Sequence, residues 1–244
     1  MTQLRWSAWG LVMLVVASAS FAENTATPPK GITMNVVQEM NLGDLSTITR
    51  ARQHFLPPQN FRLEGTLQLK SLGINSKMVV VGDGKHIKQL TQTPFGPQAS
   101  TVDLAKVQQV IPGYSPSSDY DPSAYKKMLD EMPDKTPLPD ATLDGNRTKG
   151  YEFSATNIPL PLPSNLKLGL PKPDKVRAWI NPNDGLVRKL EILDAKGALL
   201  IRMQYTDVKT NVVIDPKIFA FKFPNNVKPM DMTQAILGHV KGTP

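Results

Sequence analysis

Residues 176–208 read VRAWINPNDGLVRKLEILDAKGALLIRMQYTDV, and this segment predicts a meander of β-strands. Its three strand-like runs are separated by Asn183-Asp184-Gly185 and by Asp194-Ala195-Lys196-Gly197. Both separators supply the turn residues that tight hairpins require. A fourth strand is predicted within KTNVVIDPKIFAFKFP, residues 209–224, where three phenylalanines occupy alternate positions before Pro224.

Successive side chains of a strand point to opposite faces of the sheet. Leu199, Ile201, Met203 and Tyr205 are therefore predicted to share one face, and Leu200, Arg202 and Gln204 the other. A sheet with one apolar face must cover that face with a second layer, which here is either a helix or a ligand.

Earlier segments repeat the strand pattern. In residues 60–70 the apolar positions alternate at Phe61, Leu63, Leu67 and Leu69. Residues 76–81 and 85–91 form a further predicted pair around Gly82-Asp83-Gly84, and residues 143–155 return to a strand pattern. The sequence thus predicts a mainly β protein of the α+β class.

Helices are predicted in two places. Residues 32–55 are expected to be helical in two pieces that break at Gly43, although the segment around 33–37 also suits a strand. Asp121-Pro122 begins the clearest predicted helix, which ends at Met132 and carries an apolar stripe that includes Met128 and Leu129. Between these helices, residues 102–111 suit a strand and a short helix equally well.

Proline-rich insertions are expected near residues 112–140 and 156–175. Residues 158–173, IPLPLPSNLKLGLPKP, alternate leucine with proline, so they cannot form a central strand. They are predicted to be an edge strand or a polyproline-like loop that covers the core or lines the mouth of an apolar pocket.

The first 22 residues predict a signal peptide. Arg5 precedes an apolar run at residues 9–17, and Ser20-Phe21-Ala22 resembles a cleavage site. The run is shorter than the ~20 residues of a membrane span, although an N-terminal membrane anchor is the alternative. No cysteine is available for lipid attachment, so we expect a soluble, unanchored periplasmic protein.

Composition is consistent with one domain, residues 32–244, after a flexible leader at residues 23–31. The chain has 244 residues and no cysteine, which excludes disulfides and thiolate metal sites. Its net charge of +7 is spread along the chain without a basic run. Peripheral contact with anionic membranes or acidic partners is compatible with this charge, but we favour ordinary solubility as its role and expect no nucleic-acid partner.

Catalytic signatures are missing from the sequence. His54, His86 and His239 are isolated, and no nucleophile elbow, P-loop or dinucleotide fingerprint is present. The acidic pairs at Asp119/Asp121 and Asp130/Glu131 suit the start and the polar face of a helix. We therefore expect neither an enzyme nor a bound cofactor or metal.

Residues 180–224 resemble the LolA-like outer-membrane lipoprotein carrier superfamily. The matching positions are Pro182, Gly185, Leu186, Asp194, Gly197, Tyr205, Asp207, Val208, Asn211, Ile214, Asp215, Phe219, Phe221 and Pro224. Residues 61–70 and 142–154 agree only in strand pattern, and the proline-rich insertions depart from the carriers.

This resemblance implies a half-open antiparallel β-barrel with helices packed on or inside its concave face. It also implies a periplasmic carrier or binder of lipid-like ligands, namely lipoprotein acyl chains or free lipid, with receptor proteins of the inner or outer membrane as candidate partners. The alternative is an envelope regulatory or structural module that uses the same fold to bind a protein.

An acyl chain requires apolar volume, and methionine adapts well to irregular apolar shapes. The candidate cavity positions are those on the predicted apolar faces, namely Leu63, Leu67, Met78, Val80, Met128, Leu129, Met132, Ile192, Ile201 and Met203.

Overall fold

The computed structural model describes residues 30–43, 45–110, 130, 134–155, 172–235 and 237. Within these ranges the chain is built almost entirely of strands: β1 (Gly31–Leu42), β2 (Leu45–Leu56), β3 (Asn60–Leu69), β4 (Ile74–Asp83), β5 (His86–Thr93), β6 (Gly96–Asp103), β7 (Thr136–Leu143), β8 (Asn146–Ser154), β9 (Pro173–Ile180), β10 (Val187–Asp194), β11 (Leu199–Val212) and β12 (Met230–Asp231). The helical elements are short: η2 (Lys70–Leu72), α2 (Leu104–Val110) and η5 (Pro216–Phe219).

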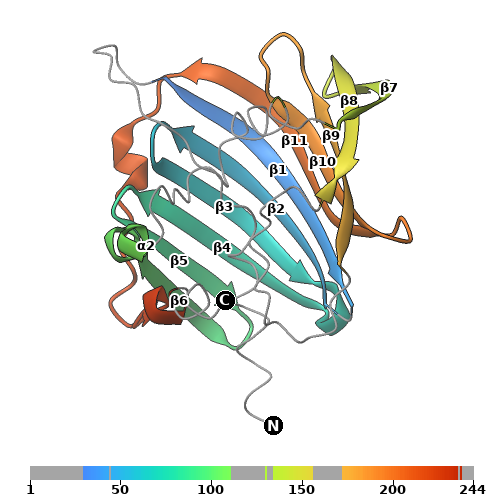
Figure 1. The fold of residues 1–244 in the computed structure, drawn as a ribbon. Coiled ribbons are helices and arrows are strands. Elements are labelled where there is room, and N and C mark those ends of the chain that lie inside the picture. Colours follow the sequence, from blue (N-terminus) through green and yellow to red (C-terminus); the bar gives the residue numbers. More distant parts are fainter. Residues whose placement is uncertain are drawn as a thin grey trace.

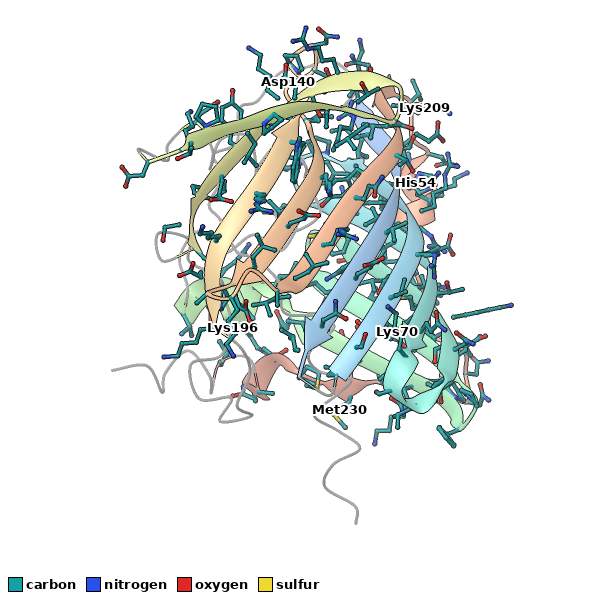
Figure 2. The ribbon with its side chains drawn as sticks, turned by 90° about the vertical axis from the view of Figure 1, so that its right-hand side faces the viewer. His54, Lys70, Asp140, Lys196, Lys209 and Met230 are labelled. Carbon is teal, nitrogen blue, oxygen red and sulfur yellow. The ribbon has the colours of Figure 1, made fainter. Side chains whose placement is uncertain are left out.

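All of these strands belong to one 12-stranded sheet in the order β12-β6-β5-β4-β3-β2-β1-β11-β10-β9-β8-β7. Neighbouring strands are antiparallel except for the short parallel pair of β12 and β6. The sheet is curved: Figure 2 shows the outer side of β1, β2 and β11 in front and strands of the other half behind them, while in Figure 1 α2 lies beside β5 and β6. The predicted fold class, a half-open antiparallel barrel with helices against its concave face, is confirmed.

Glycines on the strands allow the close packing that accompanies this curvature. A Cβ atom on Gly65 would lie 2.0 Å from the backbone oxygen of Arg50, and one on Gly82 would lie 2.2 Å from the ring of Phe61. Any larger residue at either position would force neighbouring strands apart. Glycine within a strand often marks this kind of bend or close approach.

Residues 31–56 correct the first helical prediction. Instead of two helices they form the hairpin of β1 and β2, which turns at Gly43 with a φ of 62°. The helical reading relied on Val36, Val37 and Met40, but the burial of β1 follows a two-residue period. In β2 the inward positions include buried polar residues, which obscure that period in the sequence.

Residues 209–224 correct the prediction of a fourth C-terminal strand. β11 continues to Val212, and the chain then leaves the sheet and forms η5. Asp215 begins this turn by accepting a hydrogen bond from the backbone N–H of Lys217, with Pro216 in the first helical position. Phe219 then packs on the outer side of the sheet with Leu56, Val81 and Ile214.

The strands predicted at residues 60–70, 76–81, 85–91 and 143–155 correspond to β3, β4, β5 and the β7–β8 hairpin. Near residues 102–111 both alternatives occur in succession, since β6 ends at Asp103 and α2 begins at Leu104. Apart from Asp130, the helix predicted at 121–132 lies outside the described residues, as do residues 156–171 of the second proline-rich insertion.

The outer side of the sheet carries a row of alternating charges across five strands: Glu152 on β8, Arg177 on β9, Glu191 on β10, Arg202 on β11 and Glu39 on β1. The Arg177 and Glu152 side chains are 2.7 Å apart, and Arg202 lies 3.0 Å from Glu191 and 3.5 Å from Glu39. Opposite charges on directly facing positions favour the observed strand register. This row identifies the outer side as the solvated one, so the apolar side chains are left to the concave face.

Candidate ligand-binding face

The strand register defines which residues point to the concave face. Met40 faces both Thr47 on β2 and Ile201 on β11, while Leu63 faces both Gln53 on β2 and Val80 on β4. Residues directly opposite each other across an antiparallel pair share a face. Away from the register shifts, the concave face therefore comprises the even positions of β1, β4 and β10 and the odd positions of β2, β3, β5 and β11. The prediction for Leu199 and Leu200 was wrong: the register shifts there, Leu199 faces Leu193, and Leu200 joins the same apolar cluster as Ile201.

Apolar residues on this face gather in two tracts. The first tract is contributed by β1 and β8–β11, and its inward members include Met34, Val36, Met40, Phe153, Val176, Ala178, Leu190, Ile192, Ile201, Met203 and Tyr205. The second tract is contributed by β2–β6, and its members include Ala51, Phe55, Phe61, Leu63, Leu67, Leu69, Met78, Val80, Ile87 and Val102. Leu104 and Val107 of α2 and Leu237 pack against the second tract.

Seven of the residues predicted from the sequence lie on this face. Leu63, Leu67, Met78 and Val80 belong to the second tract, and Ile192, Ile201 and Met203 belong to the first. All seven are buried. The other three candidates, Met128, Leu129 and Met132, lie outside the described residues. Contact of any of these side chains with a ligand stays a prediction.

Buried polar side chains lie between the two tracts over part of their length, while Ile32 and Leu45 pack against both tracts. Thr47, Thr49 and Gln53 point inward from β2, between the apolar residues of β1 and those of β3. A second set of polar side chains follows on β5, where the buried Gln89 donates from Nε2 to the Thr91 hydroxyl at 3.1 Å. The concave face therefore combines two apolar tracts with buried polar side chains on β2 and β5.

Ser76 is the most unusual polar residue of this face. Its position on β4 faces Leu67 on β3, which in turn faces Thr49 on β2. Ser76 is only 3% exposed, and its hydroxyl oxygen has no hydrogen-bond partner among the described residues. A buried hydroxyl without a partner costs about 1–3 kcal/mol, so its presence calls for an explanation.

Arg188 introduces a positive charge at one end of the first tract. It lies at a register shift in β10, next to Val187 of the first tract, and it is 2% exposed. Its guanidinium group donates to the Asp184 carboxylate and, at 3.3 Å, to the Leu186 carbonyl. Its Nε has no partner among the described residues. The turn sequence NPNDG thus forms a hairpin and also supplies the counter-ion of a buried arginine.

These polar residues were missed as candidates for different reasons. The polar residues of β2 were hidden by the helical reading of residues 32–55. Ser76 was placed in a strand, but a single serine in a strand carries no distinguishing signal. Arg188 comes directly after the recognised turn, and the available signal was Asp184, four residues earlier in that turn, which supplies its counter-ion.

Three of the ionisable groups with shifted pKa values lie on the outer side of the sheet, away from the concave face. A hydrogen bond from Arg177 lowers the pKa of Glu152, and a hydrogen bond from Arg62 lowers the pKa of Glu64. Burial and the nearby Arg52 lower the pKa of His54. All three groups are on the outer side of the sheet, on β8, β3 and β2. The described residues contain no cluster of three or more histidine or carboxylate groups that could hold a metal ion.

Comparisons with known proteins give fold neighbours only. No family model matches the sequence, and no curated protein matches it. The similar solved structures include an uncharacterised conserved protein from Thermus thermophilus, with a TM-score of 0.47 and 12% identity over 82% of this chain and 90% of that chain.

Two further solved structures are similar to this chain. A LolA superfamily protein from Nitrosomonas europaea has a TM-score of 0.27 and 13% identity over 79% of this chain and 91% of that chain. The MucA/MucB complex of Pseudomonas aeruginosa has a TM-score of 0.35 and 14% identity over 80% of this chain and 56% of that chain. The similar structures thus include a member of the superfamily that residues 180–224 resemble.

Proposed function

We propose that the protein binds a lipid-like ligand, with acyl chains lying against the concave face of the sheet, and carries it through the periplasm. The two apolar tracts supply the surface for the acyl chains. Each methylene group that is removed from water contributes ~0.8 kcal/mol, so affinity for such a ligand requires apolar area and no catalytic group. The proposed role is therefore ligand binding and transport, without catalysis.

The unpartnered hydroxyl of Ser76 is the observation that carries the proposal. A face that only completed the protein core would place alanine or another apolar residue there, because an unsatisfied buried hydroxyl is destabilising. An amphiphile supplies what this hydroxyl lacks, since its ester, amide or carboxyl oxygen can accept a hydrogen bond within an apolar surrounding. Thr49, which lies in the same row of the face beyond Leu67 and about two strand spacings from Ser76, is a separate polar group.

The periplasmic location is part of the proposal, and it rests on the signal-peptide pattern of residues 1–22. Within the described ranges, no helix has the length and apolar character needed to cross a membrane. Receptor proteins that load or unload the ligand at a membrane belong to the same proposal and follow from the need to move an insoluble cargo.

The test is binding of a fluorescent fatty acid, 11-(dansylamino)undecanoic acid, to a pair of variants. Ile201→Glu places an unpaired carboxylate on the concave face, where it is strongly disfavoured, and should reduce binding by more than tenfold. Gln204→Glu, three residues later and on the outer side, faces Lys189 across the strand pair and should bind like the wild type. Arg202 is unsuitable as the control because it pairs with Glu191 and Glu39.

Native mass spectrometry of protein purified from the periplasm should show a co-purifying lipid. If the wild type binds no apolar probe and carries no lipid, or if Ile201→Glu binds as well as Gln204→Glu, the carrier proposal is wrong. Recovery of a stable protein complex without lipid would then favour the alternative, an envelope module that binds a protein partner.

A further inference from the structure

One end of the sheet carries two exposed apolar side chains on neighbouring hairpin tips. Leu72 lies in η2, between β3 and β4, and is 66% exposed. Phe95 lies between β5 and β6 and is 67% exposed. Since β4 begins where β5 ends, with Lys77 facing Gln92, both tips lie at the same end of the sheet. We refer to this end, with residues 70–73 and 93–96, as the tip end.

Both tips have a defined backbone. The η2 turn closes through a hydrogen bond of 3.3 Å from the Gly73 N–H to the Lys70 carbonyl, with Gly73 in the left-handed region at a φ of 62°. In the second tip the Thr93 hydroxyl donates to the Gly96 carbonyl at 2.9 Å and accepts from the Phe95 N–H at 3.1 Å. Leu72 and Phe95 are therefore held in an exposed position by their own turns.

Two lysines lie beside the first tip, and no described acidic side chain forms an ion pair with them. Lys70 and Lys77 are exposed and form no ion pair with any described residue. Residues 66–78 and 89–101 contain these two lysines and no aspartate or glutamate. Exposed apolar side chains beside unpaired lysines are the combination that binds anionic membrane surfaces, since the apolar groups enter the interface and the lysines attract acidic headgroups.

We propose that the tip end docks on an anionic lipid bilayer by inserting Leu72 and Phe95, with Lys70 and Lys77 binding the headgroups. A bilayer fits this surface better than a protein does. The two tips are separated by about two strand spacings, or roughly 10 Å. Two exposed side chains at this spacing cannot supply the continuous contact area of a protein interface, whereas a bilayer accepts separate insertion points.

The position of the tip end suits a protein that exchanges ligand with a membrane. Ser76 lies four residues after Leu72, at the second inward position of β4, after Ile74. A ligand with its polar group at Ser76 would therefore have that group near the docked end. The docking inference does not depend on what the concave face binds, because it rests on the exposed tips and their charge.

The experiment is flotation with vesicles of phosphatidylcholine alone or with phosphatidylglycerol, using the full chain in the same form for every variant. The wild type should bind the mixed vesicles and bind the neutral ones more weakly. Leu72→Ser and Phe95→Ser should each lower the partition coefficient by about tenfold. Lys70→Gln and Lys77→Gln should each lower it about fivefold on anionic vesicles only.

Val213 provides a matched control. It is 90% exposed and follows Val212, which faces Gly31 at the start of β1, so it lies at the opposite end of the sheet. Val213→Ser should leave vesicle binding unchanged. A tryptophan introduced by Leu72→Trp should shift its emission to the blue on anionic vesicles and be quenched by brominated lipid.

Failure of this inference is distinct from failure of the carrier proposal. If the wild type does not bind anionic vesicles, or if the serine variants at the tips bind as the wild type does, docking at the tip end is wrong, whatever the fatty-acid probe does. Conversely, loss of vesicle binding in Leu72→Ser with unchanged binding of 11-(dansylamino)undecanoic acid supports docking separately from the ligand site. Equal loss in Val213→Ser would show a nonspecific apolar effect and would also overturn the inference.

Discussion

Replacement of Ser76 by alanine separates a ligand-binding hydroxyl from a structural one. The substitution removes one oxygen atom from a residue that is 3% exposed and leaves the strand and its neighbours in place. Because the oxygen has no hydrogen-bond partner among the described residues, its removal breaks no hydrogen bond to any of them. We therefore expect Ser76→Ala to stabilise the protein and to weaken ligand binding, which are effects of opposite sign.

The expected magnitudes follow from the environment of the hydroxyl. Relief of an unsatisfied buried polar group contributes about 1–3 kcal/mol to the free energy of unfolding. Alanine has a lower strand propensity than most residues, which offsets a few tenths of a kcal/mol. The net gain should be about 1–2 kcal/mol, which raises the Tm by about 2–8 °C for a chain of this size. Loss of one hydrogen bond to the ligand should weaken binding by roughly three- to tenfold.

Thr91→Val is the matched control on the same face. Its hydroxyl is also buried, but it accepts a hydrogen bond from Gln89 Nε2 at 3.1 Å. The substitution leaves the Gln89 amide without that partner, so we expect a loss of about 1–2 kcal/mol in the free energy of unfolding. Urea denaturation followed by circular dichroism measures both variants, and titration with 11-(dansylamino)undecanoic acid measures binding.

Two outcomes would refute this reasoning. A Ser76→Ala variant that is destabilised as much as Thr91→Val would mean that the Ser76 hydroxyl is satisfied in the folded protein. A variant that is stabilised but binds the probe with unchanged affinity would mean that the ligand makes no use of the hydroxyl, and the amphiphile argument would lose its main support.

Three further predictions test other parts of the account. Gly82→Ala should lower the free energy of unfolding by about 1–3 kcal/mol, because its Cβ would lie 2.2 Å from the Phe61 ring. Adding Phe61→Leu to the same chain should reduce that loss. If the loss in the double variant equals the sum of the two single losses, the contact between these residues is not its cause. The hydrogen bond from Arg177 lowers the pKa of Glu152 from 4.5. The stability that this ion pair contributes is therefore present above pH 4.5 and is lost as the pH falls through the pKa of Glu152 in the folded protein. Arg177→Gln should make the free energy of unfolding, measured by urea denaturation, fall less steeply in acid, and an unchanged pH profile would refute this role of the ion pair. N-terminal sequencing of exported protein should begin at Glu23, and retention of residues 1–22 would contradict the signal peptide.

Much of the fold could be predicted because turn chemistry and alternation agree locally. In residues 176–208 the turns place Gly185 and Gly197 in positive-φ conformations, and burial alternates along residues 201–206 of β11 as expected. The same agreement predicted β3, β4 and β5. The fourth C-terminal strand failed because alternation of phenylalanines was read without regard to Asp215-Pro216, which start a helical turn and lead the chain off the sheet.

The hairpin of β1 and β2 failed for a reason that bears on function. Strand prediction depends on apolar residues at every second position, and β2 places Thr47, Thr49 and Gln53 at inward positions where apolar residues are expected. Sequence rules tend to fail at sites where function requires a locally unfavourable residue. These polar residues of β2 made the strand difficult to recognise in the sequence. In the structure the same residues lie between the two apolar tracts of the concave face. If the ligand carries acyl chains joined at a polar linkage, these residues are where the linkage would lie, and Thr49→Val should weaken binding of such a ligand more than it weakens binding of a simple hydrocarbon. An equal effect on both probes would instead assign Thr49 to packing alone, and its position between the tracts would then have no role in choosing the ligand.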